Sequence, residues 1–140
     1  MNKKFVIGDI HGGLKALHQV LNQVRFDKED TLIFLGDFVD GWSESPAVLD
    51  FLIALQSKQS CVFIRGNHDD LVLKWLTGDT ADFNEDLWFQ HGGKATALSY
   101  KNVATTDKAK HIHFLLLRGS HDPTHQHSRP ARGHPFVPLY

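Results

Sequence analysis

The chain has 140 residues, 41% of them hydrophobic, which is enough for one domain with a buried core. Its formal net charge is −1, so no general electrostatic field attracts nucleic acid or an anionic membrane. No apolar stretch approaches the roughly 20 residues of a membrane span. We therefore expect a soluble cytoplasmic protein without specific nucleic-acid binding and without a membrane partner. The single cysteine, Cys61, lies in an apolar run, where we expect a buried and unreactive thiol.

Continuous apolar runs at residues 4–7, 31–35 and 61–64 predict short buried strands, each followed closely by a glycine. Between these runs, apolar residues recur at helical spacing. Strands that are apolar throughout and that alternate with helices are typical of a parallel sheet with helices on its faces. The sequence therefore predicts an α/β fold.

The helical spacing predicts a first helix from residue 14. Its expected apolar face comprises Leu14, Leu17, Val20, Leu21 and Val24. A second helix is expected to begin at Ser45, with Ser45 as the N-cap and Pro46 at the first helical position. A third is expected around residues 71–76.

The second half of the chain is less regular. "LWFQHGGKATALSY" predicts a short helix, a turn and another helix, and "TTDKAKHIHFLLLR" predicts a further helix. Thr105 or Thr106 is the expected cap of that last helix, with Ala109, Ile112 and Leu116 on one face. Residues 119–140 are rich in histidine and proline and show no periodicity. We expect a domain over residues 1–118 and an irregular tail over 119–140.

Three loops at the ends of the predicted strands carry polar residues: "GDIHG", "GDFVDGW" and "GNHDD". Right-handed crossovers bring the carboxyl ends of parallel strands to one edge of the sheet, so Asp9, His11, Asp37 and Asn67 are expected to converge. Carboxylate, imidazole and amide ligands suit Mn²⁺, Fe²⁺ or Zn²⁺. Two such ions can clamp a phosphate for in-line attack. The alternative is structural, because an aspartate after a strand commonly caps the following helix, as Asp9 and Asp69 would.

These loops resemble the successive motifs GDxHG, GDxVDRG and GNHE of the calcineurin-like metallophosphoesterases. The resemblance is strongest to the branch of serine/threonine protein phosphatases and diadenosine-tetraphosphate hydrolases. "HGGKATALSY" is similar to the branch's NGG-x-x-T-x-x-SY stretch, with His91 where the pattern has Asn. The resemblance covers residues 4 to about 118. It implies the N-terminal half of a β-sandwich flanked by helices, in the order βαβαβα.

The resemblance also implies roles for individual residues. Asp9 and His11 would bind a first divalent ion, Asp37 would bridge two ions, and Asn67 would bind the second. Manganese is the metal we expect, with iron or zinc as alternatives. The implied activity is that of a phosphatase in which a hydroxide held by the two ions attacks a phosphoester. The substrate would be a phosphoprotein or a dinucleoside polyphosphate.

His68 matches the proton donor of the family, and Asp40 matches the acid that orients it. Gly41 stands where the family has the arginine that holds the substrate phosphate. Arg65 is the nearest basic residue in sequence, and we name it as a candidate for substrate binding. Trp42 could stack on a base or an aromatic leaving group, or it could simply be packed against the loop.

The sequence lacks the HAG and GHT contexts in which the family carries two further metal-binding histidines. The second ion would then have only Asp37 and Asn67, and the sheet would expose an apolar face. The alternative function is therefore a truncated, catalytically impaired fragment or a weak metal-binding module of the same family. A third possibility is a plain α/β domain with capping aspartates.

The stretch "FLLLRGSHDPTHQH" echoes "CVFIRGNHDDLVL" and raises the question of a second copy of the site. The residues before it continue a helical pattern, and Ser120 replaces the amide ligand. His125 and His127 could bind metal weakly. We expect instead that the family sequence ends near Arg118.

Overall fold

The computed structural model describes residues 2–120. Strands β1 (Lys4–Ile7), β2 (Thr31–Phe34), β3 (Ser60–Arg65) and β4 (Gly119–Ser120) form a sheet in the order β1-β2-β3-β4. All the pairings are parallel, with Val6 opposite Ile33 and Ile33 opposite Val62. The predicted α/β fold with a parallel sheet is confirmed.

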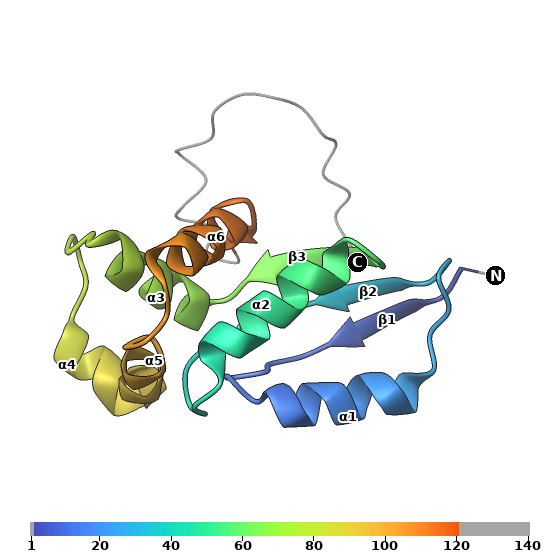
Figure 1. Ribbon diagram of the computed structural model, residues 1–140, viewed down its shortest axis with the longest axis horizontal. Coiled ribbons are helices and arrows are strands. Elements are labelled where there is room, and N and C mark those ends of the chain that lie inside the picture. Colours follow the sequence, from blue (N-terminus) through green and yellow to red (C-terminus); the bar gives the residue numbers. More distant parts are fainter. Residues whose placement is uncertain (1, 121–140) are drawn as a thin grey trace.

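The helices are α1 (Leu14–Val24), α2 (Ser45–Gln56), α3 (Asn67–Thr77), α4 (Glu85–Trp88), the π-helical segment η1 (Phe89–Gly93), α5 (Lys94–Ser99) and α6 (Thr105–Leu116). In Figure 1 the arrows of β1, β2 and β3 point toward the end of the molecule where α3, α4 and α5 gather. The residues that follow these strands therefore meet at that end. No helix of the described part is long and apolar enough to cross a membrane.

The core lies between one face of the sheet and the helices. Leu32 and Phe34 of β2 are 0% exposed, and the Phe34 ring stacks on Phe63 of β3 at 5.0 Å. Burying one such side chain contributes about 1.5–3 kcal/mol. Cys61 is half-buried on β3, and burial raises the pKa of its thiol to about 11, as expected for an unreactive cysteine.

The opposite face of the sheet is partly bare. Val6 is 62% exposed and Val62 is 48% exposed, on either side of the buried Ile33. Helices on both faces, which the continuous apolar runs suggested, are not present over these residues. The expected exposure of an apolar face is confirmed in the part of the chain that the structure describes.

Two details of the first two helices differ from the sequence prediction. Val20 is 43% exposed on α1, so the apolar face is narrower than its spacing suggested. Ser45 is not the N-cap of α2 but its first residue, after Glu44. The Ser45 hydroxyl is buried and accepts a hydrogen bond from the Asp40 backbone N–H at 3.1 Å. A tertiary hydrogen bond thus replaces the local cap.

The last helix is turned relative to its predicted face. His111, Phe114 and Leu115 are buried, whereas Leu116 is 58% exposed. The Phe114 ring packs edge-on against Phe63 at 5.1 Å, and this contact decides which side of α6 faces inward. The predicted cap is also wrong, because the N-cap is Ala104 and it makes no side-chain cap bond.

The end of α6 is anchored to the sheet. The Arg118 guanidinium lies over the Phe63 and Phe114 rings and donates a hydrogen bond to Gln56 Oε1 at 2.7 Å. The next residues, Gly119–Ser120, pair with β3, so the irregular segment that we predicted from residue 119 does not begin there. The expectations for His125, His127 and the rest of 121–140 lie outside the described residues.

Candidate active site

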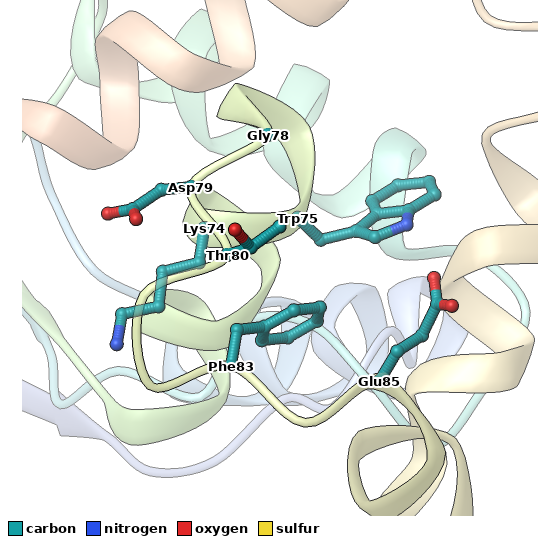
Figure 2. Close-up of a pocket in the computed structure, with 7 residues that line it drawn as sticks. All are labelled: Lys74, Trp75, Gly78, Asp79, Thr80, Phe83 and Glu85. Atoms are coloured by element: carbon teal, nitrogen blue, oxygen red, sulfur yellow. The ribbon is translucent and has the colours of Figure 1, made fainter.

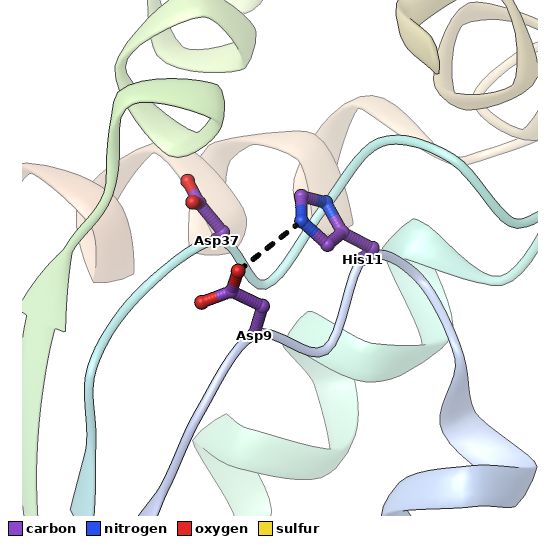
Figure 3. Close-up of side chains that lie close together, drawn as sticks. All are labelled: Asp9, His11 and Asp37. Carbon is purple, nitrogen blue, oxygen red and sulfur yellow. Dashed lines mark ion pairs between the residues drawn. The ribbon is translucent and has the colours of Figure 1, made fainter.

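The loops after β1 and β2 bring three of the predicted metal ligands together. One ligand atom each from Asp9, His11 and Asp37 lies within 4.8 Å of the others. Figure 3 shows the Asp9 and His11 side chains facing each other beside Asp37, with 3.7 Å between Asp9 Oδ2 and His11 Nε2. The Asp9 side chain is 63% exposed and that of His11 is 34% exposed, so the cluster is open to solvent. This donor set of two carboxylates and an imidazole fits a divalent transition metal.

Asp9 does not cap a helix. The N-cap of α1 is Gly13, and no side chain makes the cap bond. The structural alternative that we kept for Asp9 is therefore wrong.

Backbone hydrogen bonds hold the two loops side by side. Ile10 N and His11 N both donate to Asp37 O, at 3.0 and 2.9 Å. His11 and Asp37 have φ values of 48° and 50°, which residues other than glycine rarely adopt. Such a conformation costs about 1–3 kcal/mol and persists where surrounding contacts enforce it, commonly at functional sites. The Nδ1 of His11 lies 3.2 Å from Val39 O, and this contact orients the ring with Nε2 toward Asp9.

Asn67, the fourth predicted ligand, is the first residue of α3 and is exposed. The residues on both sides of it touch Asp37. The His68 N–H donates to Asp37 Oδ1 at 3.0 Å, and a Cβ added at Gly66 would lie only 2.2 Å from the same oxygen. Only glycine at position 66 lets the start of α3 approach Asp37 this closely.

His68 and Asp40 form the predicted pair. His68 Nδ1 lies 2.9 Å from Asp40 Oδ2, with the Asp40 carboxylate 0% exposed and the His68 side chain 19% exposed. The hydrogen bond to Asp40 raises the pKa of His68 above its usual value, although burial opposes this. The His68 ring meets the His11 ring edge-on at 5.0 Å, which places the His68–Asp40 pair directly beside the cluster of Asp9, His11 and Asp37.

Asp69 stands where the GNHE motif has glutamate, and its role in this structure is to hold two loops together. Its carboxylate is 0% exposed and accepts hydrogen bonds from Phe38 N at 2.8 Å and Gly66 N at 2.9 Å. It thereby completes a capping box of α3 from the third helical position and fastens the loop after β2 to the helix. The N-cap that the structural alternative assigned to Asp69 is instead Gly66. Burial raises the pKa of the Asp69 carboxyl to about 7, against the effect of the two donors.

The Arg65 side chain contacts helices α3 and α6 and not the cluster of Asp9, His11 and Asp37. Its Nη1 donates to Leu115 O at 2.9 Å, its Nε pairs with Asp70, and its side chain is 13% exposed. These contacts fasten α3 and α6 to the end of β3. Substrate binding by Arg65 stays a prediction that its contacts do not favour.

Trp42 lies at the surface beside the cluster. The residue is 71% exposed, and its backbone N–H donates to His11 O at 2.9 Å. The packed alternative for this residue is therefore wrong, because most of the residue is open to solvent.

Residues that the sequence prediction did not single out complete the surroundings of Asp40. Trp88 Nε1 donates to Asp40 Oδ2 and Thr96 Oγ1 donates to Asp40 Oδ1, each at 2.6 Å. The available signal for Thr96 was the stretch "HGGKATALSY", whose resemblance to a family motif carried no assigned role, and Trp88 lies before that stretch. A second network, from Tyr100 Oη to His111 Nδ1 and from His111 Nε2 to Asp50 Oδ1, each 2.8 Å, joins α6 to α2. Tyr100 ends the same family-like stretch, whereas His111 and Asp50 were not singled out in the sequence.

A cavity of about 260 Å³ lies at the far end of α3. Figure 2 shows Trp75 and Phe83 projecting to the same side of this hollow, with Glu85 beside them and Lys74 on the other side. The predicted metal and catalytic residues do not line it. The chemistry of the described residues is therefore concentrated at the loops and not in this cavity.

The parallel α/β sheet thus collects two carboxylates, an imidazole and a separate His–Asp pair at its carboxyl end, where α/β folds form their ligand sites. Residues 3–106 match the model of the calcineurin-like phosphoesterase family, and the chain belongs to this family.

Curated relatives and solved structures agree with this family. The chain is 46% identical over 66 residues to a symmetrical bis(5'-nucleosyl)-tetraphosphatase of Proteus mirabilis, covering 46% of this chain and 23% of the relative. It is 33% identical over 90 residues to serine/threonine-protein phosphatase 1 of Salmonella typhimurium, covering 64% of this chain and 38% of the relative. A crystal structure of a candidate diadenosine tetraphosphatase superposes with a TM-score of 0.54 at 25% identity, over 77% of this chain and 40% of that one. The chain thus spans well under half the length of these proteins.

Proposed function

We propose that this chain forms the metal-binding and proton-donating part of a phosphoester hydrolase. The site has two halves, the ligand cluster of Asp9, His11 and Asp37 and the His68–Asp40 pair. The observation that carries the proposal is the contact between these halves, in which the His11 and His68 rings meet at 5.0 Å. Ligands for a metal and a buried His–Asp pair are then within reach of one phosphate group. Neither half alone would distinguish a hydrolase from a simple metal-binding domain.

Asp9, His11 and Asp37 would hold a first divalent ion, and Asp37 with Asn67 would hold a second. Manganese is the ion we propose, with iron or zinc as alternatives. When bound, the ions supply the nucleophilic water and neutralise charge on the phosphate. Asp37 suits the shared position because it lies between the first loop and the start of α3, to which it is already hydrogen-bonded through His68 N.

His68 is the proposed proton donor to the leaving oxygen. Asp40 occupies Nδ1, so Nε2 is the ring nitrogen that can serve a substrate. The hydrogen bond to Asp40 raises the pKa of His68, which favours the protonated ring that a general acid requires. Asp40 would fix the orientation of the ring and stabilise its charge without taking the proton itself.

The substrate class is a phosphoester of a nucleotide or of a phosphoprotein, after the names of the two relatives. Trp42 is exposed and its backbone is hydrogen-bonded to that of His11, and an exposed indole on this loop favours a substrate with an aromatic base that would stack on it. We therefore propose a dinucleoside polyphosphate as the substrate and a phosphoprotein as the alternative.

Metal titration followed by a phosphatase assay tests the proposal. We expect Mn²⁺ to bind and p-nitrophenyl phosphate to be hydrolysed, with both Asp37→Asn and His68→Asn abolishing turnover. Metal binding without turnover would support the alternative of a weak metal-binding module. Absence of both would leave an α/β domain, and turnover that survives both substitutions would refute the site.

A further inference from the structure

The Asp40 carboxylate is enclosed by a segment that lies far from it in sequence. Its Oδ2 accepts hydrogen bonds from both His68 Nδ1 at 2.9 Å and Trp88 Nε1 at 2.6 Å. Its Oδ1 accepts the hydroxyl of Thr96 at 2.6 Å. Because Asp40 is 0% exposed, no water replaces these donors, and they alone fix the plane of the carboxylate.

From this arrangement we propose that Trp88 and Thr96 are positioning residues for the proton donor, acting on His68 through Asp40. The inference rests on the proposed function, in which His68 protonates the leaving oxygen. A carboxylate that accepted only the His68 bond could rotate about its Cβ–Cγ axis, and the imidazole would turn with it. The two donors from the α4–α5 segment hold the carboxylate in one orientation.

Trp88 is itself held in place on several sides. The residue is 1% exposed, and its rings contact Trp75 at 5.4 Å and Phe83 at 5.6 Å. A Cβ added at Gly93 would lie 2.2 Å from the indole, so only glycine leaves room for the ring there. The indole N–H is thereby aimed at Asp40 with little freedom.

Thr96 is fixed by an equally complete network. Its hydroxyl lies 3.0 Å from Ser45 Oγ, and both hydroxyl oxygens accept the Asp40 backbone N–H at 3.1 Å. Asp40 needs this support, because its φ of 69° is rare for a residue other than glycine. The backbone and the carboxylate of Asp40 therefore depend on the same threonine.

The leaving group separates positioning from general destabilisation. A general acid matters most when the leaving oxygen is a poor one, so a misplaced His68 slows phenyl phosphate more than 2,4-dinitrophenyl phosphate. We expect Trp88→Phe and Thr96→Val each to lower kcat on phenyl phosphate by about tenfold, the value of one hydrogen bond to a charged group. KM and the rate on dinitrophenyl phosphate should change little.

Matched variants isolate the hydrogen bonds. Thr96→Ser keeps the hydroxyl and should restore the rate that Thr96→Val loses. Thr106→Val makes the same exchange at an exposed threonine of α6 and should leave the leaving-group dependence as in the parent chain. Equal losses on both substrates in Trp88→Phe and Thr96→Val, or no rescue by serine, would overturn the inference.

A spectroscopic readout decides the question without turnover. In alkaline buffer the ¹⁵N shifts of neutral His68 should show a proton on Nδ1 in the parent chain and a mixture of both tautomers in Trp88→Phe and Thr96→Val. An unchanged tautomer in both variants would contradict positioning. The outcome for the proposed function is separate, because His68→Asn that hydrolyses phenyl phosphate at the parent rate would remove the proton-donor role itself.

Discussion

The two halves of the site are built in opposite ways. The side chains of Asp9 and His11 are 63% and 34% exposed and meet at 3.7 Å, a distance too long for a hydrogen bond. The Asp40 carboxylate is fully buried, and donors occupy both of its oxygens. Hydrogen bonds between side chains thus fix the proposed proton donor, whereas the Asp9 and His11 side chains of the proposed ligand cluster meet without one.

The largest effect is expected from Asp37→Asn. Asp37 contributes to the ligand cluster and also accepts the His68 N–H, so its loss should weaken Mn²⁺ binding and disturb the second half as well. We predict a fall in turnover of more than about 10³-fold, because the ions supply several kcal/mol of transition-state stabilisation. Calorimetric titration with Mn²⁺ and an aryl phosphatase assay measure both effects. Asp82→Asn, which removes an exposed carboxylate outside the cluster, is the control and should behave as the parent chain.

Asp40→Asn should separate the two halves. Its carboxylate contacts His68 and not the ligand cluster, so turnover should fall by about 10²-fold while Mn²⁺ affinity changes little. The raised pKa of His68 should also fall toward its usual value, because the hydrogen bond to Asp40 is the main cause of the shift. NMR titration of His68 in the parent chain and in Asp40→Asn measures this change in pKa. An equal loss of metal affinity would contradict the division between the halves.

Gly66→Ala tests the close approach of α3 to Asp37. The new Cβ would lie 2.2 Å from Asp37 Oδ1 and must displace it. We predict a loss of about 1–3 kcal/mol in the free energy of unfolding and weaker metal binding. Gly8→Ala is the matched control, since a Cβ there meets nothing within 4 Å and should be tolerated. Urea denaturation curves of the two variants measure the difference. Equal stability of Gly66→Ala and Gly8→Ala would contradict the requirement for glycine at position 66.

Asp30 offers a test at the other end of the sheet, away from the site. Hydrogen bonds from Asp27 N and Lys3 N, each 2.8 Å, lower the pKa of the Asp30 carboxyl below its usual value. The stabilisation is therefore present above that usual value and is lost as the pH falls through the lowered one. We predict that Asp30→Asn lowers the urea midpoint at neutral pH and that the difference shrinks in strong acid. A difference that grows on acidification would have the wrong sign.

The smallest effect is expected from Trp42→Ala. An indole that stacks on a nucleobase contributes about 1–3 kcal/mol, so KM for a dinucleoside polyphosphate should rise roughly 5- to 10-fold or more. KM for a phosphopeptide should not change. The free energy of unfolding should not change either, because Trp42 is largely exposed. A similar KM change for both substrates would argue against stacking.

The sequence predicted the positions of most elements because the apolar runs and the glycines after them are local signals. It placed Asp9, His11 and Asp37 together correctly, since parallel topology alone brings strand ends to one edge. The inward face of α6 was missed because contacts with Phe63, distant in sequence, decide it. Ser45 was read as a local cap, but its hydroxyl serves Asp40.

The donors around Asp40 were not predictable from spacing. Trp88 and Thr96 lie 48 and 56 residues away from it, and the kink at His91 and Gly92 separates the two helices that carry them. The same holds for Arg65, whose sequence position suggested the site but whose guanidinium reaches Leu115 O. Long-range packing, which leaves no periodic signal, determines these contacts.

Anomalous diffraction from crystals grown with Mn²⁺ tests whether the loops after β1, β2 and β3 form one metal-binding site. We predict a manganese peak among Asp9, His11 and Asp37, with the His68 ring beside it and still bonded to Asp40. A peak elsewhere in the chain, or none at this cluster under conditions in which Mn²⁺ binds in solution, would contradict the claim.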